Sequence, residues 1–246
     1  MTAPVFVVDA LEFPGGQYVL DGPEGRHAVS VKRLRPGEGV VLTDGRGRWA
    51  QGVVKAAEGK DRLVVMDLET VHEEPTAQPR ITVVQALPKG DRGELAVETM
   101  TEVGVDAIVP WAAARCITQW KGERGLKALG KWRATAREAG KQSRRVRFPE
   151  VTDIATTKRV ASLLAEADFA AVLHETGDAP LAAAELPERG EIVLVVGPEG
   201  GIAPEELSLF EAAGARPYRL GPTVLRTSTA GTAAAALLLG RTGRWS

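Results

Sequence analysis

The sequence predicts a two-domain protein, in which a small β-barrel is followed by an α/β domain with a parallel sheet. Up to His72, short apolar runs are cut by glycine and proline, a pattern typical of strands joined by tight turns. From Ile81 onward, apolar runs of strand length alternate with helical periodicity, which indicates βαβ units. The acidic, proline-containing stretch from Glu73 to Pro79 separates the two patterns. We therefore expect domains at residues 1–72 and 73–246.

Two features define the first domain besides its strands. Asp44-Gly45 followed by Arg46-Gly47 predicts a hairpin, because such turns need the positive φ that glycine tolerates. Residues 26–37 predict a short helix with a basic face, which Pro36 ends. The strands are expected at residues 5–8, 40–42, 51–54 and 63–66.

The second domain is predicted from fully apolar strands, which a parallel sheet covered on both faces requires. A helix over 92–103 is expected to carry Leu95, Thr99 and Val103 on one face. The other expected elements are strands at 81–87, 107–111, 169–173, 192–196 and 218–220, and helices at 122–142, 158–167 and 231–239.

Two loops are predicted to form one ligand crevice. The segment from Gly197 to Glu206 follows one strand and opens a helix, and the segment from Gly221 to Ala230 does the same after the next strand. Loops at the carboxyl ends of parallel strands meet at one edge of the sheet. A glycine loop is also compatible with a purely structural turn. No Gly-Lys-Ser/Thr follows, so it is not a phosphate loop, and no GxGxxG indicates a dinucleotide fold.

The composition is that of an ordinary globular protein, with 44% hydrophobic and 26% charged residues. The single cysteine, Cys116, has no partner for an internal disulfide, and no apolar run approaches the roughly 20 residues that span a bilayer. The N-terminal residues 1–11 lack the basic cluster of a secretory signal. We expect a cytoplasmic protein without a membrane partner.

A basic stripe runs from Arg115 to Arg147, where eleven Lys or Arg residues stand against two acidic ones in a chain of net charge −1. Such a concentration favours polyanion binding, although a solvated helix face is the plain alternative. Trp111, Trp120 and Trp132 near the stripe are candidates for base stacking or for core packing.

Several motifs together resemble the ribosomal RNA small-subunit methyltransferase E family of the SPOUT superfamily. They are Gly197-Pro198-Glu199-Gly200-Gly201, Leu220-Gly221, Val224-Leu225-Arg226-Thr227, Leu87-Pro88-Lys89, Thr101-Glu102-Val103-Gly104-Val105, Glu138-Ala139 with Gln142 and Arg144 or Arg145, and the His27 helix ending Leu34-Arg35-Pro36-Gly37. The resemblance extends through the whole chain. It implies a PUA-like first domain, a SPOUT α/β methyltransferase domain with a C-terminal trefoil knot, and a homodimer.

The resemblance further implies S-adenosylmethionine as the cofactor, no metal, and N3-methylation of one uridine in 16S ribosomal RNA, either free or in the small subunit. By the same likeness, the cofactor lies between three loops and their flanking residues. The implied cofactor-binding residues are Leu173, His174, Glu175, Gly197, Pro198, Glu199, Gly200, Gly201, Ile202, Leu220, Gly221, Val224, Leu225, Arg226 and Thr227.

Four residues depart from the family pattern. The family commonly has Glu at Ser228, Gln-Lys at Glu98-Thr99 and Glu at Lys141. The change at Ser228 removes a carboxylate that is a candidate base, whereas the change at Lys141 strengthens the basic stripe.

The candidate residues for catalysis are Arg226, Glu199 and Ser228. Uracil N3 must lose its proton before it attacks the methyl group, and Arg226 is expected to hold the resulting anion or a phosphate. A structural salt bridge is its alternative. Glu199 is interpreted as a base or as a stabiliser of the following helix. The residues expected to bind RNA are Arg26, Lys32, Arg33, Lys89, Arg115, Arg137, Lys141, Gln142, Arg144 and Arg145.

Two other functions are also compatible with the sequence. One is a SPOUT enzyme that acts on transfer RNA, and the other is a non-catalytic RNA-binding factor for ribosome assembly. The full-length resemblance favours the uridine N3-methyltransferase over the first, and Ser228 in place of Glu keeps the second open.

Overall fold

The computed structural model describes residues 3–245 and divides into two compact units. The N-terminal unit comprises the chain up to Thr76 together with Gly140–Phe148, and the C-terminal unit comprises Ala77–Ala139 and the chain from Pro149 onward. The main boundary therefore falls inside the acidic stretch that separates the two sequence patterns. The return of Gly140–Phe148 to the first unit was not predicted.

The N-terminal unit is a curved sheet around its own core. Its pairing order is β1-β3-β4-β5-β2, and β6 pairs with β4. The strands are β1 (Val5–Val7), β2 (Tyr18–Leu20), β3 (Gly39–Thr43), β4 (Arg48–Glu58), β5 (Arg62–Met66) and β6 (His72–Glu73). Phe6, Leu42 and Leu63 are fully buried between them. The two end strands of this order, β1 and β2, do not pair with each other within residues 3–245, so the barrel is partly open.

The predicted hairpin turn is confirmed between β3 and β4. Gly45 and Gly47 have φ values of 72° and 106°, which only glycine adopts readily. The carboxylate of Asp44 accepts hydrogen bonds from the backbone N–H groups of Arg46 and Arg48, at 2.7 and 3.2 Å. The sequence Asp-Gly-Arg-Gly thus builds the turn from its own residues.

The basic helix begins earlier than expected. Helix α1 (Gly22–Arg26) continues into a π-helical turn, His27–Val31, and the chain leaves it at Arg33 with a φ of 54°. Pro23 occupies the first turn, where a missing N–H costs nothing. The helical region thus covers residues 22–31, and the predicted bounds of 26–37 were wrong, because Pro23 favours a helix start and Arg33 leaves the helical conformation before Pro36 is reached.

The segment Gly140–Phe148 is bonded along the β3–β4 hairpin. The carbonyl of Val146 accepts hydrogen bonds from the hydroxyl of Thr43 at 2.8 Å and from the N–H of Gly47 at 3.1 Å. The N–H of Phe148 donates to the carbonyl of Gly45 at 2.9 Å. The segment thus lies along the β3–β4 hairpin as part of the N-terminal unit.

The C-terminal unit is built on a parallel seven-stranded sheet with the order β11-β13-β10-β12-β7-β8-β9. The strands are β7 (Arg80–Ala86), β8 (Ala107–Trp111), β9 (Glu150–Val151), β10 (Phe169–Leu173), β11 (Ala179–Pro180), β12 (Glu191–Val196) and β13 (Arg216–Arg219). Every residue of β8 is buried, as expected for a strand covered on both faces. The predicted α/β class is confirmed, while the trefoil knot itself stays a prediction.

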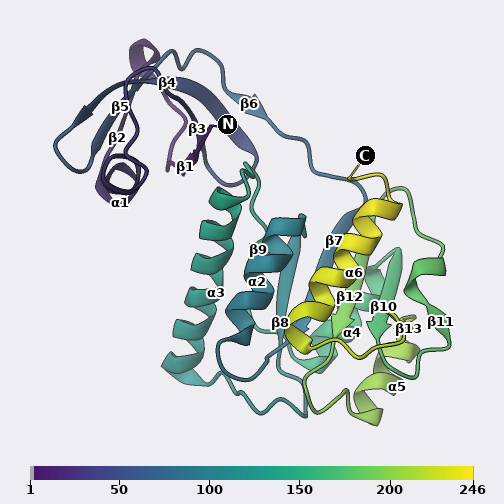
Figure 1. The fold of residues 1–246 in the computed structure, drawn as a ribbon. Helices are drawn as coiled ribbons and strands as arrows, with labels where there is room; N and C mark the ends of the chain where they lie inside the picture. Colours follow the sequence, from purple (N-terminus) through teal and green to yellow (C-terminus); the bar gives the residue numbers. More distant parts are fainter. Residues whose placement is uncertain (1–2, 246) are drawn as a thin grey trace. The chain divides into compact units, whose positions relative to one another are not determined.

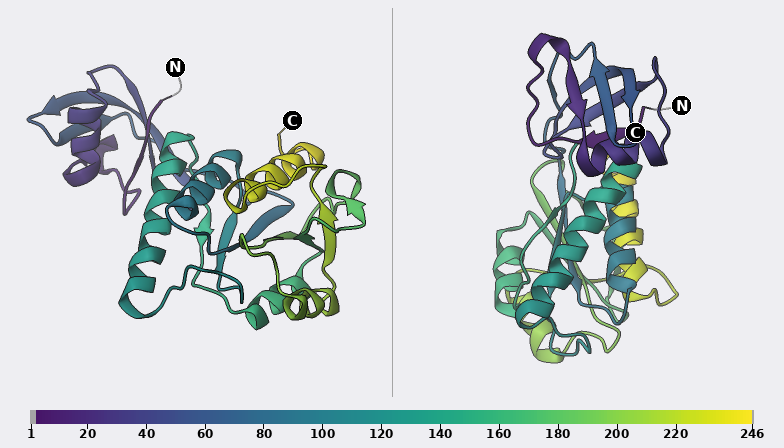
Figure 2. Two further views of the ribbon diagram at one scale, coloured as in Figure 1. Left: turned by 60° about the horizontal axis from the view of Figure 1, so that its bottom comes forward. Right: turned by 90° about the vertical axis from the view of Figure 1, so that its left-hand side faces the viewer.

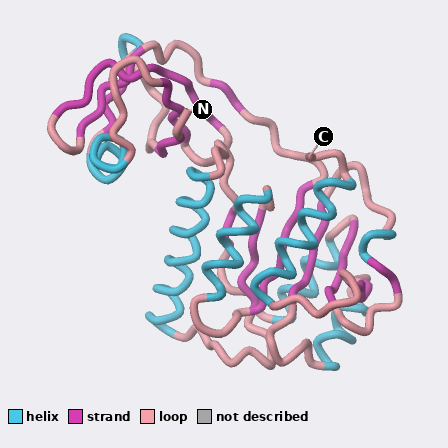
Figure 3. Tube along the Cα trace, viewed as in Figure 1, coloured by secondary structure: helices cyan, strands magenta, loops and turns pink. Residues whose placement is uncertain are grey.

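Helices cover both faces of this sheet (Figures 1 and 3). They are α2 (Arg92–Val103), α3 (Gly122–Gln142), α4 (Thr157–Glu166), α5 (Pro204–Ala212) and α6 (Thr227–Arg241), with a short 3-10 turn, Leu181–Ala183. Two separate apolar clusters result, one under α2, α3 and α6 and the other under α4 and α5. No helix within residues 3–245 is both long and apolar enough to cross a membrane.

Helices α2 and α6 lie side by side on one face (Figure 2). The buried face of α2 contains Ala96, Val97 and Met100, whereas Leu95 is 42% exposed. Of the residues expected on one face, Val103 packs against the core, whereas Leu95 stays largely exposed. A Cβ on Gly231 of α6 would stand 2.9 Å from the sulfur of Met100, so small residues on α6 allow the close packing.

Candidate functional site

Three loops meet at the carboxyl edge of the sheet in the C-terminal unit. Strands β13, β10 and β12 are parallel neighbours, so the turn after Leu173, the glycine loop Gly197–Ala203 and the loop Leu220–Arg226 all leave the same edge (Figure 1). The backbone N–H of His174 donates to the carbonyl of Tyr218 at 3.0 Å, which ties two of these loop regions together. The predicted convergence is thus present in the structure.

The glycine loop is a tight turn that requires its glycines. A Cβ on Gly197 would stand 2.7 Å from a side-chain carbon of Ile202, and Gly201 has a φ of 74°. The N–H of Gly201 donates to the carbonyl of Pro198 at 2.9 Å. Ile202 is consequently folded back as a buried side chain against the start of the loop.

Glu199 connects the glycine loop to the loop after β7. Its side chain is exposed, and one carboxylate oxygen accepts a hydrogen bond from the backbone N–H of Lys89 at 3.1 Å. The expected stabilisation of the following helix, α5, comes instead from Glu206, whose Oε2 accepts a hydrogen bond from the N–H of Ala203 at 3.3 Å. A role for Glu199 as a base stays a prediction.

Glu206 joins three parts of the site edge and was not predicted for that role. It is 6% exposed, and its Oε1 accepts hydrogen bonds from the N–H of Ala114 and the hydroxyl of Thr157, both at 2.9 Å. A buried carboxylate with several donors is strongly held, since charge-assisted hydrogen bonds are about twice as strong as neutral ones. Its place three residues after the N-cap of α5 is a sequence pattern that indicates capping.

Arg115 and Cys116 lie beside the glycine loop. Arg115 donates to the carbonyl of Gly200 at 3.2 Å. Burial raises the pKa of the Cys116 thiol, and two backbone hydrogen bonds oppose this rise without cancelling it. The nearby carboxylates of Glu206 and Glu199 raise the pKa of the thiol further. Cys116 is therefore a protonated thiol at neutral pH and a poor nucleophile.

His174 belongs to the framework of its own turn. Its Nδ1 lies 2.8 Å from the hydroxyl of Thr176 and accepts the N–H of Thr176 at 3.3 Å. A Cβ on Gly177 would stand 2.7 Å from the backbone of Tyr218, so the turn packs directly on β13. Glu175, between them, is exposed.

The loop before α6 exposes apolar side chains and a cation. Val224 is 81% exposed and Leu225 is 40% exposed. Arg226 is the N-cap of α6, where its carbonyl accepts from the N–H groups of Thr229 and Ala230 at 2.9 Å. Its exposed guanidinium has no hydrogen bond or ion pair to any residue from 3 to 245. The structural salt bridge considered for Arg226 is therefore not formed within this range.

Gln85 supports the start of α6 from beneath and was not predicted. It is fully buried on β7, and its amide nitrogen donates to the carbonyl of Thr227 at 3.3 Å. Ser228 is also buried, at 1% exposure, and its hydroxyl lacks a hydrogen-bond partner among residues 3–245. This burial argues against direct contact of Ser228 with a substrate, although its predicted role stays untested.

The departure at Thr99 lies on the same helix pair as Ser228. The hydroxyls of Thr99 on α2 and Thr232 on α6 are 2.7 Å apart. Thr232 stands one turn after Ser228, so neutral hydroxyl groups occupy this part of the packed interface.

The predicted RNA-binding residues are distributed over both units. Arg26, Lys32, Arg33, Lys141, Gln142, Arg144 and Arg145 belong to the N-terminal unit, and Lys89, Arg115 and Arg137 belong to the C-terminal unit. Lys141 is 4% exposed and forms an ion pair with Glu24 at 2.9 Å, so its ammonium group is not at the surface. Trp111 and Trp132 are buried, and Trp120 packs edge to face on Trp132, which favours the packing alternative for these three.

The family models match both parts of the chain. A model described as an RNA methyltransferase domain matches residues 74–239, and one described as an RNA methyltransferase PUA domain matches residues 20–66. Among curated relatives, the ribosomal RNA small subunit methyltransferase E of Mycobacterium bovis is 47% identical over 250 residues, covering 100% of this chain and 94% of that protein. The Bacillus subtilis protein of the same name is 27% identical and covers 87% of this chain and 86% of its own length.

Solved structures give the same result. A Legionella pneumophila protein solved with bound S-adenosylmethionine superposes with a TM-score of 0.83 at 27% identity, covering 98% of each chain. The ribosomal RNA small subunit methyltransferase E of Neisseria gonorrhoeae, also bound to S-adenosylmethionine, gives a TM-score of 0.79 at 29% identity and 98% coverage of each chain. With its full-length match and both domain models, this chain belongs to the ribosomal RNA small subunit methyltransferase E family.

Proposed function

We propose that this protein transfers a methyl group from S-adenosylmethionine to N3 of one uridine in the 16S ribosomal RNA of the small subunit. The observation that carries the proposal is the convergence of the three loops after β10, β12 and β13 at one edge of the sheet. Two family relatives are named as small-subunit ribosomal RNA methyltransferases, and one of them was solved with this cofactor.

The loops fit an adenosine group. Gly221 has open space where a Cβ would stand, and Val224 and Leu225 present apolar surface beside it. An apolar slot edged by backbone N–H and C=O groups suits adenine, which is flat and bonds through its ring edge. When bound, the cofactor supplies an electrophilic methyl group on a positively charged sulfur.

Arg226 stabilises the nucleophile in this proposal. Its guanidinium is exposed and unpaired among residues 3–245, and its backbone is fixed as the N-cap of α6. A guanidinium with paired N–H donors stabilises the oxygens of a uracil that has lost its N3 proton. The backbone of Arg226 is held as the N-cap of α6, and its exposed side chain is free to turn toward the bound base.

Of the two candidate bases, Glu199 is the residue that removes the N3 proton. Its carboxylate is exposed, and among residues 3–245 only one of its two oxygens accepts a hydrogen bond, from the N–H of Lys89. Ser228 is buried and a hydroxyl is a weak base, so it is less suited to this step. The uridine must leave its base stack to present N3 to these groups.

A homodimer and a cytoplasmic location complete the proposal. Ribosomal RNA as the substrate would place the enzyme in the cytoplasm. The small residues of α6, such as Gly231 and Ala235, are buried in the core, so they do not by themselves support a dimer. Light scattering on the purified protein measures the oligomeric state directly.

The decisive experiment is methyl transfer to small ribosomal subunits, and separately to free 16S RNA, from cells that lack this gene. Tritiated S-adenosylmethionine provides the label, and nucleoside mass spectrometry identifies the product. The expected product is 3-methyluridine. Another methylated nucleoside would indicate a different SPOUT activity. No product with either RNA, despite an intact fold, would favour a non-catalytic factor for ribosome assembly.

A further inference from the structure

The N-terminal unit contains a cleft that no role described above uses. Its volume is about 660 Å³, which lies within the usual range for small-ligand sites. Val5, Val41 and Val146 contribute apolar lining from β1, from β3 and from the segment Gly140–Phe148. The return of that segment therefore completes the cleft.

A stacked aromatic pair lines the cleft. Trp49 on β4 and His72 on β6 are direct cross-strand neighbours, and their ring centroids are 4.5 Å apart with 29° between the ring planes. Trp49 is half-buried and His72 is exposed. A pre-stacked pair of this kind is a platform for one more flat ring, because aromatic side chains stack on unpaired nucleobases.

A cation and an amide lie at the same cleft. Arg144 is exposed, and its guanidinium has no hydrogen bond or ion pair to any described residue. Its backbone has a φ of 64°, an uncommon conformation for a residue other than glycine. Such conformations cost energy and persist where the surroundings fix them, often at binding sites. Gln51, also in the cleft, offers a side-chain amide that both donates and accepts.

Two carboxylates narrow the choice of base. Glu73 and Glu74 also line the cleft, and a carboxylate accepts hydrogen bonds but donates none. Adenine, cytosine and guanine carry an exocyclic amino group that donates hydrogen bonds, whereas uracil in RNA has a carbonyl oxygen at the equivalent ring position and donates only from its N3–H. The cleft therefore favours an amino-bearing base over uracil.

We propose that this cleft binds one unstacked, amino-bearing nucleobase of the RNA substrate, stacked on the Trp49–His72 pair with an adjacent phosphate at Arg144. The proposal deepens the proposed function, since it rests on RNA being the substrate. It assigns to the N-terminal unit a base-reading role at a nucleotide other than the one that is methylated.

The test is a double-mutant cycle in which a protein variant is combined with an abasic RNA. Short overlapping RNAs of the 16S sequence are screened for binding to the full-length protein, and the tightest binder is remade with an abasic site at each position in turn. One abasic position is expected to weaken binding about 5- to 100-fold, the size expected for base–aromatic stacking. Trp49→Ala should weaken binding to the intact RNA by a similar factor and add nothing with that abasic RNA, because both changes remove the same contact.

Controls separate the stacking contact from folding. Trp245→Ala removes another exposed tryptophan, in the C-terminal unit, and should leave RNA binding unchanged. His72→Ala, at an exposed position, provides a second variant if Trp49→Ala unfolds the N-terminal unit. Replacing the amino-bearing base with uracil should weaken binding by less than the abasic site does, because uracil keeps the stacking contact and lacks only the amino group.

Three results would overturn the proposal. They are additive losses of affinity from Trp49→Ala and the abasic site, an equal loss of affinity at every abasic position, and no RNA binding at all. Methyl transfer and calorimetric cofactor binding are measured on the same samples. Failure of methyl transfer with an intact stacking cycle would reject the proposed function alone. Normal methylation together with additive losses in the double-mutant cycle would reject base binding in the cleft alone.

Discussion

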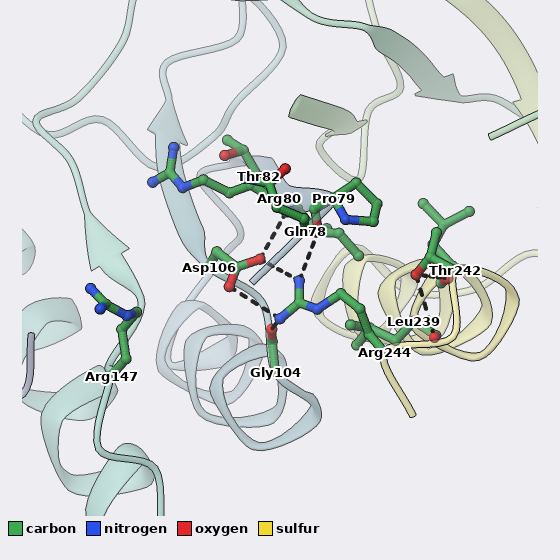
Figure 4. A network of polar contacts seen from close by, with 12 residues as sticks. Gln78, Pro79, Arg80, Thr82, Gly104, Asp106, Arg147, Leu239, Thr242 and Arg244 are labelled. Atoms are coloured by element: carbon green, nitrogen blue, oxygen red, sulfur yellow. Dashed lines mark hydrogen bonds and ion pairs between the residues drawn. The ribbon is translucent and has the colours of Figure 1, made fainter. Parts of the chain in front are cut away.

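The guanidinium of Arg244 forms two hydrogen bonds with the carboxylate of Asp106, at 2.5 Å from Nη1 to Oδ2 and 3.2 Å from Nη2 to Oδ1 (Figure 4). Arg244 also donates to the carbonyls of Pro79 and Gly104, and Asp106 accepts from the N–H of Ile81 at 2.8 Å. This network joins the end of the chain to the amino ends of β7 and β8. It lies away from the loops of the candidate site, which leave the carboxyl ends of the strands.

We expect Arg244→Leu to lower the free energy of unfolding by about 3–5 kcal/mol, because it leaves the carboxylate of Asp106 buried without its cation. Urea unfolding measures the effect. Arg62→Leu breaks the exposed ion pair with Glu58 and should cost less than about 1 kcal/mol. Equal effects of the two substitutions would show that the Arg244 network contributes no more than a surface pair.

Arg226→Ala should abolish methyl transfer while cofactor affinity changes by no more than a few-fold. The reason is that its guanidinium is exposed, whereas the loop geometry depends on its backbone as the N-cap. Single-turnover methylation and calorimetry with S-adenosylmethionine provide the two measurements. Arg219→Ala, an exposed arginine at the end of β13, is the control and should retain activity. Unchanged turnover in Arg226→Ala would remove this residue from the site.

Glu206→Gln should destabilise the protein by about 1–3 kcal/mol and weaken cofactor binding, because it removes the charge from a buried acceptor of three hydrogen bonds. The bonds from Ala114 and Ala203 hold the loops after β8 and β12, so both loops would loosen together. Thermal unfolding and calorimetry test the two effects. Glu205→Gln alters the adjacent, exposed carboxylate and should change neither the stability of the protein nor its cofactor affinity. A stable Glu206→Gln variant with normal cofactor affinity would contradict the assigned role.

Arg144→Gly should weaken RNA binding without lowering stability. Glycine adopts the positive φ of this position at no steric cost, while the loss of one phosphate contact reduces the salt dependence by a log-log slope of about 0.7. Asp67→Gly is a matched control, since Asp67 also has a positive φ of 63° but no positive charge. It should relieve backbone strain and leave RNA binding unchanged. An unaltered salt slope in Arg144→Gly would place the phosphates elsewhere.

Alkylation of Cys116 should be slow at neutral pH and should accelerate only at a pH above the ordinary range for a cysteine thiol. Burial raises the pKa of the thiol, and the thiolate is the reactive form, so reactivity appears as the pH rises through the raised value. The rate of iodoacetamide modification against pH measures this directly, with urea-unfolded protein as the reference. In Glu206→Gln the midpoint should move down, because one of the carboxylates that raise the pKa is neutralised. Identical pH profiles for the folded and unfolded protein would refute the prediction.

Local patterns predicted most elements of the C-terminal unit closely. The ranges 92–103, 107–111, 122–142 and 169–173 agree with the helices and strands of the structure. Each of these elements is determined by residues close in sequence, through apolar runs, periodicity and helix-ending residues. The exposure of Leu95 on α2 did not follow from the same local patterns, because burial along this helix depends on how the small residues of α6 approach it.

The candidate site was predicted in part. The glycine loop and the loop before α6 follow strands that are visible in the sequence, and parallel pairing places them at one edge. Gln85 and Glu206 were missed as supporting residues because their partners, Thr227 and Ala114, lie 142 and 92 residues away. Only the folded chain brings such groups within hydrogen-bond distance.

The sequence alone determined the two-domain order, the α/β class, the β3–β4 hairpin turn and the family to which the chain belongs, since all of these depend on local residue patterns and motifs. The tertiary structure decided that the end of the basic stripe joins the N-terminal unit, where Lys141 is buried against Glu24 and Arg144 lines a cleft with Trp49. A charge pattern gives no information on which cations are paired. That depends on contacts between residues about a hundred positions apart, which form only when the chain folds.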